Sequence, residues 1–213
     1  MLAVPRTLAS ARGVLLTFDD GPHPIGTPAV LAALEQIRAP AVFFLTGENA
    51  ARHPGLVREI VAAGHEVGVH GYRHHTRLQW SRRRLDDDTR RALDAVGRAA
   101  GVTPRLYRPP HGVVTVIGLR LVRARGLELL LWSRWGRDWE RRATASSIAR
   151  RASAGVEAGD VLLLHDSDRY SARDSWRATV AALPLIVENI AAADLAPAAV
   201  IRSGSGGGLA LTL

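Results

Sequence analysis

The sequence predicts an α/β fold in which helices pack around a parallel β-sheet. Three observations support this prediction: short apolar runs alternate with amphipathic segments, the runs are rich in Val, Leu and Phe, and most of the amphipathic segments end just before a glycine. Buried parallel strands are short apolar runs, and their alternation with helical segments is typical of βα units. From these patterns alone, the strands could form an open doubly wound sheet or a barrel.

The expected strands are the apolar runs, whose length and composition suit strands that are buried on both faces. They lie at residues 13–18, 41–46, 66–69, 105–107, 128–132 and 160–164, and residues 198–201 are a seventh candidate.

The expected helices lie between these strands, at residues 27–38, 54–63, 85–100, 115–125, 144–154 and 172–193. The first begins with Thr27 and Pro28, a capping residue followed by proline at the first helical position. The middle four are each followed by a glycine, at positions 64, 101, 126 and 155, as is typical after a helix C-terminus. Pro184 predicts a kink or a break in the last helix.

The chain length fits one globular domain. With 213 residues, of which 47% are hydrophobic, the chain can bury a core without disulfides or a structural metal. We expect the domain to span residues 1–203, followed by a Gly/Ser-rich tail over residues 204–213 that is flexible up to its last few residues. Cysteine is absent, which excludes a thiol nucleophile and a cysteine-based zinc site. The dinucleotide-binding fingerprint and the P-loop are also absent.

The chain is strongly basic, with a net charge of +8, and all 28 basic side chains are arginine. This charge could serve an anionic partner such as nucleic acid, a cell-wall polymer or a membrane surface. The scatter of the arginines favours the alternative, a coding bias that replaces lysine by arginine over the whole surface. No RNA-binding or helix-turn-helix motif is present, so we expect no nucleic-acid partner.

No segment has the pattern of a signal peptide or of a membrane span. Residues 1–13 contain no sustained apolar stretch, and no run approaches the ~18 apolar residues of a membrane-spanning helix. We therefore expect a protein without a membrane span, located in the cytoplasm.

Ionisable and metal-binding side chains follow five of the expected strands. They are Asp19 and Asp20 after the first strand, His70 and His74 after the third, Arg108 after the fourth, Asp138 after the fifth and His165 after the sixth. Each has an ordinary structural explanation by itself, such as a turn at the aspartate pair. In parallel α/β folds, however, catalytic groups gather at the C-terminal ends of the strands. The joint occurrence therefore favours one shared site.

The chemistry of these groups is coherent. One aspartate and two histidines provide the ligand set of a catalytic zinc site with a position open for water, and zinc lowers the pKa of that water to about 7. The second aspartate is then free to accept a proton, and Arg108 would keep it ionised. His165 can protonate a leaving group if Asp138 keeps it oriented and cationic. Together these groups predict hydrolysis of an ester or an amide.

Five short motifs connect the chain to a known family. They lie at residues 17–22 (TFDDGP), 64–68 (GHEVG) with the histidines that follow, 108–112 (RPPHG), 138–139 (DW) and 162–165 (LLLH). Through them the chain resembles the polysaccharide deacetylases of carbohydrate esterase family 4 over nearly its whole length. The resemblance implies a deformed (β/α) barrel of about seven parallel strands in a single domain. It also implies a metal-dependent hydrolase that removes N-acetyl groups from an amino sugar, its oligomer, or a polymer such as chitin or peptidoglycan.

The resemblance also implies a role for individual residues. By this likeness Asp19 is the catalytic base, Asp20, His70 and His74 bind the metal, Arg108 steadies Asp19, and Asp138 orients the acid His165. The substrate-binding residues are His111, through its backbone N–H at the oxyanion, and Trp139 and Leu162 in the acetyl pocket. The metal is expected to be Zn²⁺, although the same ligands would hold Co²⁺, Ni²⁺ or Mn²⁺. Several aromatic residues could offer sugar-stacking surfaces, namely Trp80, Trp132, Trp135, Trp139 and Trp176 with Tyr72 and Tyr170. Trp135 is expected at the substrate site, and the alternative for Trp132 and Trp176 is a place in the core.

The chain departs from the family pattern at three positions. Gly71 replaces a serine or threonine, His111 an aromatic residue, and Trp135 an aspartate. None of these is a ligand, the base or the acid, so the departures bear mainly on substrate choice. Two alternatives therefore stay open. One is a metal-dependent amidase acting on a small N-acetyl sugar conjugate, a cyclic amide or a formamide, and the other is a non-catalytic binder of anionic polymers.

Overall fold

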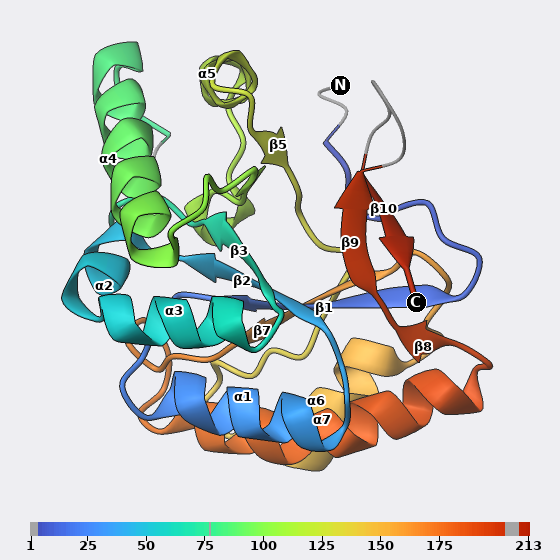
Figure 1. Ribbon diagram of the computed structural model, residues 1–213. Helices are drawn as coiled ribbons and strands as arrows, with labels where there is room; N and C mark the ends of the chain where they lie inside the picture. The colour runs from blue at the N-terminus through green and yellow to red at the C-terminus, as the bar shows by residue number, and fades with distance from the viewer. Residues whose placement is uncertain (1–3, 77, 203–208) are drawn as a thin grey trace.

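A curled sheet of seven parallel strands lies at the centre of the protein (Figure 1). The computed structural model describes residues 4–76, 78–202 and 209–213. The strands are β1 (Gly13–Asp19), β2 (Ala41–Leu45), β3 (Glu66–Val69), β4 (Leu106–Tyr107), β5 (Glu128–Leu129), β6 (Arg134–Trp135) and β7 (Val161–His165). Their spatial order is β5-β4-β3-β2-β1-β7-β6, and a short strand β8 (Ala196–Pro197) also pairs in parallel with the start of β1.

Residues 130–133 join the two edges of this sheet. The backbone N–H of Leu130 donates to the carbonyl of Tyr107 in β4 (3.0 Å), and that of Ser133 donates to the carbonyl of Val161 in β7 (3.0 Å). The segment therefore bridges the gap between the edge strands β5 and β6. This arrangement confirms the deformed barrel and excludes the open doubly wound sheet.

The helices cover the outside of the curled sheet (Figure 1). They are α1 (Gly26–Gln36), α2 (Gly47–Arg52), α3 (Pro54–Ala62), α4 (Arg82–Ala100), α5 (Val116–Ala124), α6 (Ala145–Ser153) and α7 (Ser175–Ala192), with a 3₁₀ turn η1 (Pro110–Gly112). In Figure 1, α1, α6 and α7 lie together below the sheet, and α4 stands against α2 and α3 at one end. None of the helices in the described part of the chain is long and apolar enough to cross a bilayer.

The first helix begins differently from the expectation. Thr27 was expected to cap it, but α1 already begins at Gly26. The hydroxyl of Thr27 instead accepts a hydrogen bond from the backbone N–H of His23 (2.7 Å) and donates to the buried carboxylate of Asp166. Thr27 therefore connects the first helix to the loop after β7.

The alternation of side chains along β1 separates two cores. Val14, Leu16 and Phe18 pack against the helices, whereas Leu15 packs inside the curl with Leu106 and other strand residues. Successive side chains of a strand point to opposite faces, so Thr17 and Asp19 share the inward face with Leu15. The strand thus delivers its two polar groups to the interior of the curl.

The seventh parallel strand is not the one expected. Residues 198–201 were the candidate, but β9 (Ala199–Arg202) pairs antiparallel with β10 (Leu209–Thr212), and the seventh strand is β6. Ala198 and Leu211 of this hairpin region pack into the inner core, so the hairpin closes one end of the curl. Of the predicted tail, residues 203–208, including the predicted boundary after 203, lie outside the described residues, and the last residues form β10.

Of the kink or break predicted at Pro184, the break is wrong. Helix α7 continues through this residue, which lies on its exposed side. Proline has no backbone N–H, so the carbonyl of Val180 lacks its usual partner. The helix continues nevertheless, because the buried side chains of Leu183 and Ile186 on either side of Pro184 hold it against the core.

Candidate active site

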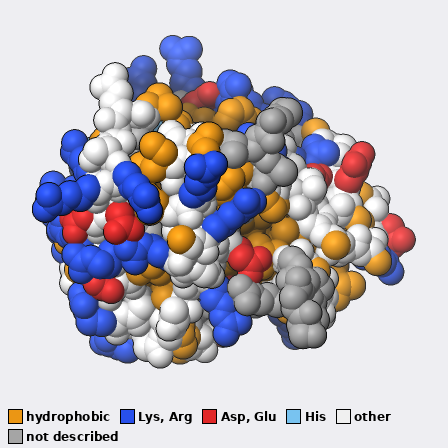
Figure 2. Space-filling model, turned by 90° about the horizontal axis from the view of Figure 1, so that it is seen from above, with side chains coloured by type: hydrophobic (Ala, Val, Ile, Leu, Met, Phe, Trp, Pro, Cys, Tyr) orange, Lys and Arg blue, Asp and Glu red, His pale blue; other side chains and the backbone are white. Residues whose placement is uncertain are grey.

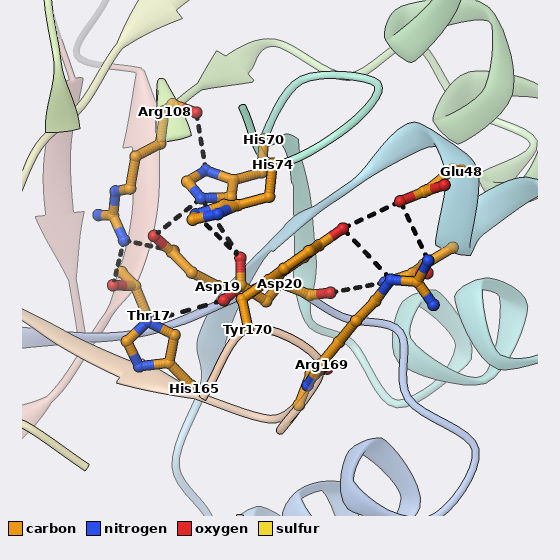
Figure 3. Close-up of polar contacts among 12 residues, drawn as sticks. Thr17, Asp19, Asp20, Glu48, His70, His74, Arg108, His165, Arg169 and Tyr170 are labelled. Carbon is orange, nitrogen blue, oxygen red and sulfur yellow. Dashed lines mark hydrogen bonds and ion pairs between the residues drawn. The ribbon is translucent and has the colours of Figure 1, made fainter. Parts of the chain in front are cut away.

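The polar residues that follow the strands converge at one end of the curl (Figure 3). Asp19 is the last residue of β1 and Asp20 follows it, His70 follows β3, Arg108 follows β4, and His165 ends β7. The parallel pairing of the strands therefore brings residues that are far apart in sequence to one place, as predicted.

Asp20, His70 and His74 form a group that could hold a metal ion. One ligand atom from each lies within 4.8 Å of the others. The Nε2 atoms of His70 and His74 are 3.6 and 3.5 Å from Oδ1 of Asp20. This buried oxygen has no hydrogen-bond partner among the described residues. Two nitrogens and one oxygen are the ligand set of a catalytic zinc site.

The electrostatics of this group also fit a cation. Burial raises the pKa of Asp20 to about 7. Burial, together with the neighbouring His70 and His111, lowers the pKa of His74 to about 2, so its ring is neutral. Metal binding needs a neutral imidazole and an ionised carboxylate, and a bound cation would supply the charge that keeps Asp20 ionised. The residues present therefore fit a divalent metal.

Asp19 is held beside the metal group by a buried arginine. Nη1 of Arg108 donates to Oδ1 of Asp19 (2.8 Å) and to the hydroxyl of Thr17 (2.7 Å). The other oxygen of Asp19 lies 3.6 Å from Nε2 of His70, so it faces the metal group. Burial raises the pKa of Asp19, and the positive charge of Arg108 partly offsets this effect. Asp19 is thus a carboxylate with one oxygen fixed and one oxygen facing the site.

His165 lies beside Asp20 and is oriented by Asp138. Its Nδ1 donates to Oδ1 of Asp138 (2.9 Å), while the other oxygen of Asp138 accepts from the backbone N–H of His165 (2.7 Å) and the hydroxyl of Thr179 (2.8 Å). Burial lowers the pKa of His165, but the Asp138 carboxylate raises it more, with help from Asp20 and Asp19, to about 10. At neutral pH the ring is a cation, and its Nε2 lies 4.0 Å from Asp20.

These groups open into a cavity of about 290 Å³ with an aromatic wall. Trp132, Trp135 and Trp139 line one side, with ring centroids 6.1 Å apart for the first two and 5.7 Å apart for the last two. Trp135 is 41% exposed, so it lies at the mouth of the cavity. His111 and Tyr170 also line it.

The expectation for Leu162 is corrected by the structure. Leu162 packs in the core between the sheet and the helices, and Leu163 lines the cavity instead. The reason is strand geometry: Leu163 and His165 are two residues apart and share a face, whereas Leu162 points the other way. The other predicted site residues line the cavity or contact a residue that lines it, and their roles stay predictions.

Two of the aromatic residues that could stack on a sugar line the cavity: Trp132, for which a place in the core was the alternative, and Tyr170. No role was expected for Thr17. Thr17 lies between Arg108 and the carbonyl of Leu162, to which it donates (2.7 Å). The inward register of β1 was a signal for Thr17, because it lies two residues before Asp19. The stacking of Tyr170 on His74 was not expected, because nothing in the local sequence indicates that contact.

Comparisons with known proteins agree with the site. The family model for polysaccharide deacetylases matches residues 8–130. A chitooligosaccharide deacetylase of Sinorhizobium fredii is 37% identical over 190 residues, which cover 86% of this chain and 88% of that protein. A peptidoglycan-N-acetylglucosamine deacetylase of Bacillus cereus is 33% identical over 180 residues, covering 83% and 81%. A family 4 carbohydrate esterase from Streptomyces lividans, solved with acetate, has a TM-score of 0.81 at 32% identity and covers 96% of this chain and 98% of that one.

Two more distant solved structures bear on the chemistry. A family 4 acetyl xylan esterase from Clostridium thermocellum, solved with cobalt, is 25% identical with a TM-score of 0.76 and covers 86% of this chain and 85% of that one. A family 4 pseudoenzyme from Bacillus anthracis is 21% identical with a TM-score of 0.78 and covers 87% and 62%. The last likeness concerns the fold alone.

Proposed function

This chain belongs to the polysaccharide deacetylase family, and on that premise we propose that it is a metal-dependent hydrolase that removes N-acetyl groups from amino sugars in chitooligosaccharides or peptidoglycan. One observation supports this proposal above all. The possible metal group of Asp20, His70 and His74 lies beside both an arginine-held carboxylate, Asp19, and a cationic imidazole, His165. A base and an acid next to a Lewis acid suit amide hydrolysis.

The metal would be held by Asp20, His70 and His74. When bound, such an ion polarises the substrate carbonyl and makes a water molecule more acidic. His70 is prepared for this role, because its Nδ1 donates to the backbone carbonyl of Arg108 (2.8 Å) and its Nε2 faces Asp20. A hydrogen bond of this kind fixes the tautomer of a ligating histidine.

Asp19 would act as the base. Its free oxygen accepts a proton from the attacking water as the water oxygen adds to the amide carbonyl carbon. Burial raises the pKa of Asp19, which makes the carboxylate a better proton acceptor, and Arg108 keeps it ionised beforehand. The backbone N–H of His111, at the wall of the cavity, would donate to the carbonyl oxygen as negative charge develops there.

His165 would act as the acid. Its Nε2 donates a proton to the amide nitrogen as the C–N bond breaks, and the products are acetate and the free amine of the sugar. Asp138 holds the ring by its Nδ1, so the proton on Nε2 faces the cavity. The aromatic wall of Trp132, Trp135 and Trp139 would contact the acetyl group and the apolar face of the sugar.

The test is acetate release from N-acetylglucosamine oligomers, peptidoglycan fragments and small N-acetyl glycosides. We expect turnover that stops with a chelator and returns when Zn²⁺ or Co²⁺ is added back. Asp19→Asn should lower kcat by about 10²–10⁴-fold with the metal content unchanged. Asp194→Asn is the matched control, because it changes an exposed surface carboxylate that pairs with Arg12.

The outcomes separate the alternatives. Full activity of Asp19→Asn, or activity that survives complete metal removal, would contradict the proposal. Turnover limited to small glycosides, or release of an acid other than acetate, would favour the non-polymeric amidase. Salt-sensitive binding to an anionic polymer without any turnover would favour the non-catalytic binder.

A further inference from the structure

We propose that Glu48 and Tyr170 form a positioning pair that fixes the ring of His74 for metal binding. The inference rests on the proposed metal-dependent function, since His74 is one of the three residues of the possible metal group. Neither Glu48 nor Tyr170 belongs to the motifs that predicted the site, and both come from loops or helix ends far from His74 in sequence.

The two histidines of the group are held in different ways. His70 is oriented by the hydrogen bond from its Nδ1 to the carbonyl of Arg108 (2.8 Å). For His74, the described residues show no hydrogen bond at the corresponding nitrogen. Metal-binding histidines almost always have such an outer partner, because it fixes the ring plane and the tautomer. Something else must therefore orient His74.

Ring contacts on two sides replace that hydrogen bond. Tyr170 stacks on His74, with centroids 4.6 Å apart and planes 21° apart. His111 meets the same ring at 4.2 Å with planes 62° apart. Both contacts oppose rotation of the His74 ring about its Cβ–Cγ bond. The stacked Tyr170 ring sets the plane directly, because the two planes are nearly parallel.

Tyr170 can act in this way because Glu48 anchors it (Figure 3). The hydroxyl of Tyr170 donates to Oε1 of Glu48 (2.9 Å) and accepts from Nε of Arg169 (3.2 Å). Glu48 is only 8% exposed although it is charged. Its oxygens also lie 3.3 Å from Nη2 of Arg169 and 3.5 Å from Nε of Arg73. The arginines compensate the buried charge and hold the carboxylate in place.

Glu48 is also attached to the segment that contains the histidines. Its backbone N–H donates to the carbonyl of Tyr72 (2.9 Å), and that of Gly47 donates to the carbonyl of Gly71 (2.8 Å). The side chain and the backbone of Glu48 therefore join the segment between His70 and His74 to the loop that supplies Tyr170. A shift of Glu48 would move both the segment that carries His74 and the Tyr170 ring that stacks on it.

The experiment is titration of the metal-free full-length protein with Co²⁺ and Zn²⁺. Tyr170→Leu, which removes both the stacking ring and the anchor, should raise the metal Kd by about 10–100-fold and change the visible spectrum of the Co²⁺ complex. Tyr170→Phe keeps the stacking ring but loses the hydroxyl that binds Glu48, and Glu48→Gln keeps the shape of the side chain but loses its charge. Each should therefore raise the metal Kd less than Tyr170→Leu does. Arg52→Gln is the control, because Arg52 reaches Glu48 from the solvent side (3.6 Å) without touching Tyr170.

The melting temperature of the metal-free variants separates positioning from general stability. A Kd that rises while the metal-free melting temperature stays near that of the wild type supports the positioning pair. An unchanged Kd and spectrum for Tyr170→Leu would overturn it, and so would an equal loss in Tyr170→Phe and Tyr170→Leu, since the ring would then have no role. If the wild-type chain itself binds no metal, the proposed function fails instead.

Discussion

Arg108 is the residue on which the geometry of the site depends most. Its side chain is completely buried and donates four hydrogen bonds. Two go to Asp19 and Thr17 on β1, and two go to the carbonyls of Leu130 (3.0 Å) and Leu131 (2.9 Å) in the segment that joins the sheet edges. The same guanidinium therefore fixes the base and closes the curl. A lysine could not do both, because a single ammonium lacks the planar fork of donors.

The first prediction concerns the charge on Asp138. In the proposed reaction His165 must be protonated, so activity should fall as the pH rises through its pKa, which Asp138 helps to raise to about 10. Asp138→Asn removes the negative charge that raises the pKa of His165, whereas the burial that lowers this pKa remains. The alkaline limb of kcat/KM should therefore move to lower pH by at least about one unit, as expected for loss of a neighbouring charge. The measurement is acetate release as a function of pH.

Thr179→Val is the control for this prediction. It removes one hydrogen bond to Asp138 and keeps the carboxylate charge. Its alkaline limb should stay close to that of the wild type even if the rate falls. An Asp138→Asn profile that keeps the wild-type alkaline limb would mean that His165 is not the acid.

Motif residues could be placed from the sequence because each follows an apolar run. Parallel pairing brings the ends of the strands together independently of the loop conformations. The positions of the residues at these ends were therefore predictable, namely Asp19, Asp20, His70, Arg108 and His165. Tyr170 and Glu48 were not, because their contacts depend on the paths of two loops and a six-residue helix. The shift from Leu162 to Leu163 was within reach of the sequence, since residues two apart on a strand share a face.

At the scale of elements, the longest apolar runs were predicted well and the shortest strands poorly. The run at residues 128–132 was expected as one strand, but only Glu128–Leu129 pairs with β4, and the rest crosses to the other edge of the sheet. β6 contains two residues, Arg134 and Trp135, and has no apolar pattern. Strands this short are held by tertiary contacts, such as the pairing of Trp135 with Leu163, rather than by local propensity.

The second prediction concerns Pro184, which interrupts the hydrogen bonds of a continuous helix. Pro184→Ala should restore the bond to the carbonyl of Val180 and remove the steric conflict, which together outweigh the greater freedom of the unfolded chain. We expect the free energy of unfolding to rise by about 1–2 kcal/mol and the melting temperature by roughly 2–8 °C.

Chemical denaturation and thermal melting would check this prediction, with Ala181→Gly as a neighbouring control. Ala181 is exposed in the same helix, so its replacement by glycine should cost about 1 kcal/mol. A lower melting temperature for Pro184→Ala would show that α7 needs the proline for its packing against α1 and α6. Acetate release should change by less than about twofold, since Pro184 lies on the solvent side of α7.

At the scale of the whole molecule, the arginines behind the net charge of +8 are spread over the surface, and several of them lie beside an acidic side chain. Figure 2 shows arginines mixed with acidic side chains on the face that includes α4. Arg90 lies beside Asp87 (2.8 Å) and Arg125 beside Asp86 (2.6 Å). Near the cavity, Arg73 and Arg169 contact Glu48. Among the described residues no arginine lines the cavity, and the cavity wall is aromatic.

The last prediction follows from this distribution. A neutral substrate such as an N-acetylglucosamine oligomer gains nothing from a positive surface, and the buried pair of Arg108 and Asp19 is hardly screened by salt. We expect kcat/KM for the neutral oligomer to change by less than about twofold between ~50 mM and ~500 mM salt. Acetate release measured across this range is the check, with an anionic peptidoglycan fragment as the comparison. A steep fall with salt for the neutral oligomer would show that surface arginines take part in binding, because counterion release produces a strong salt dependence only where charges are neutralised.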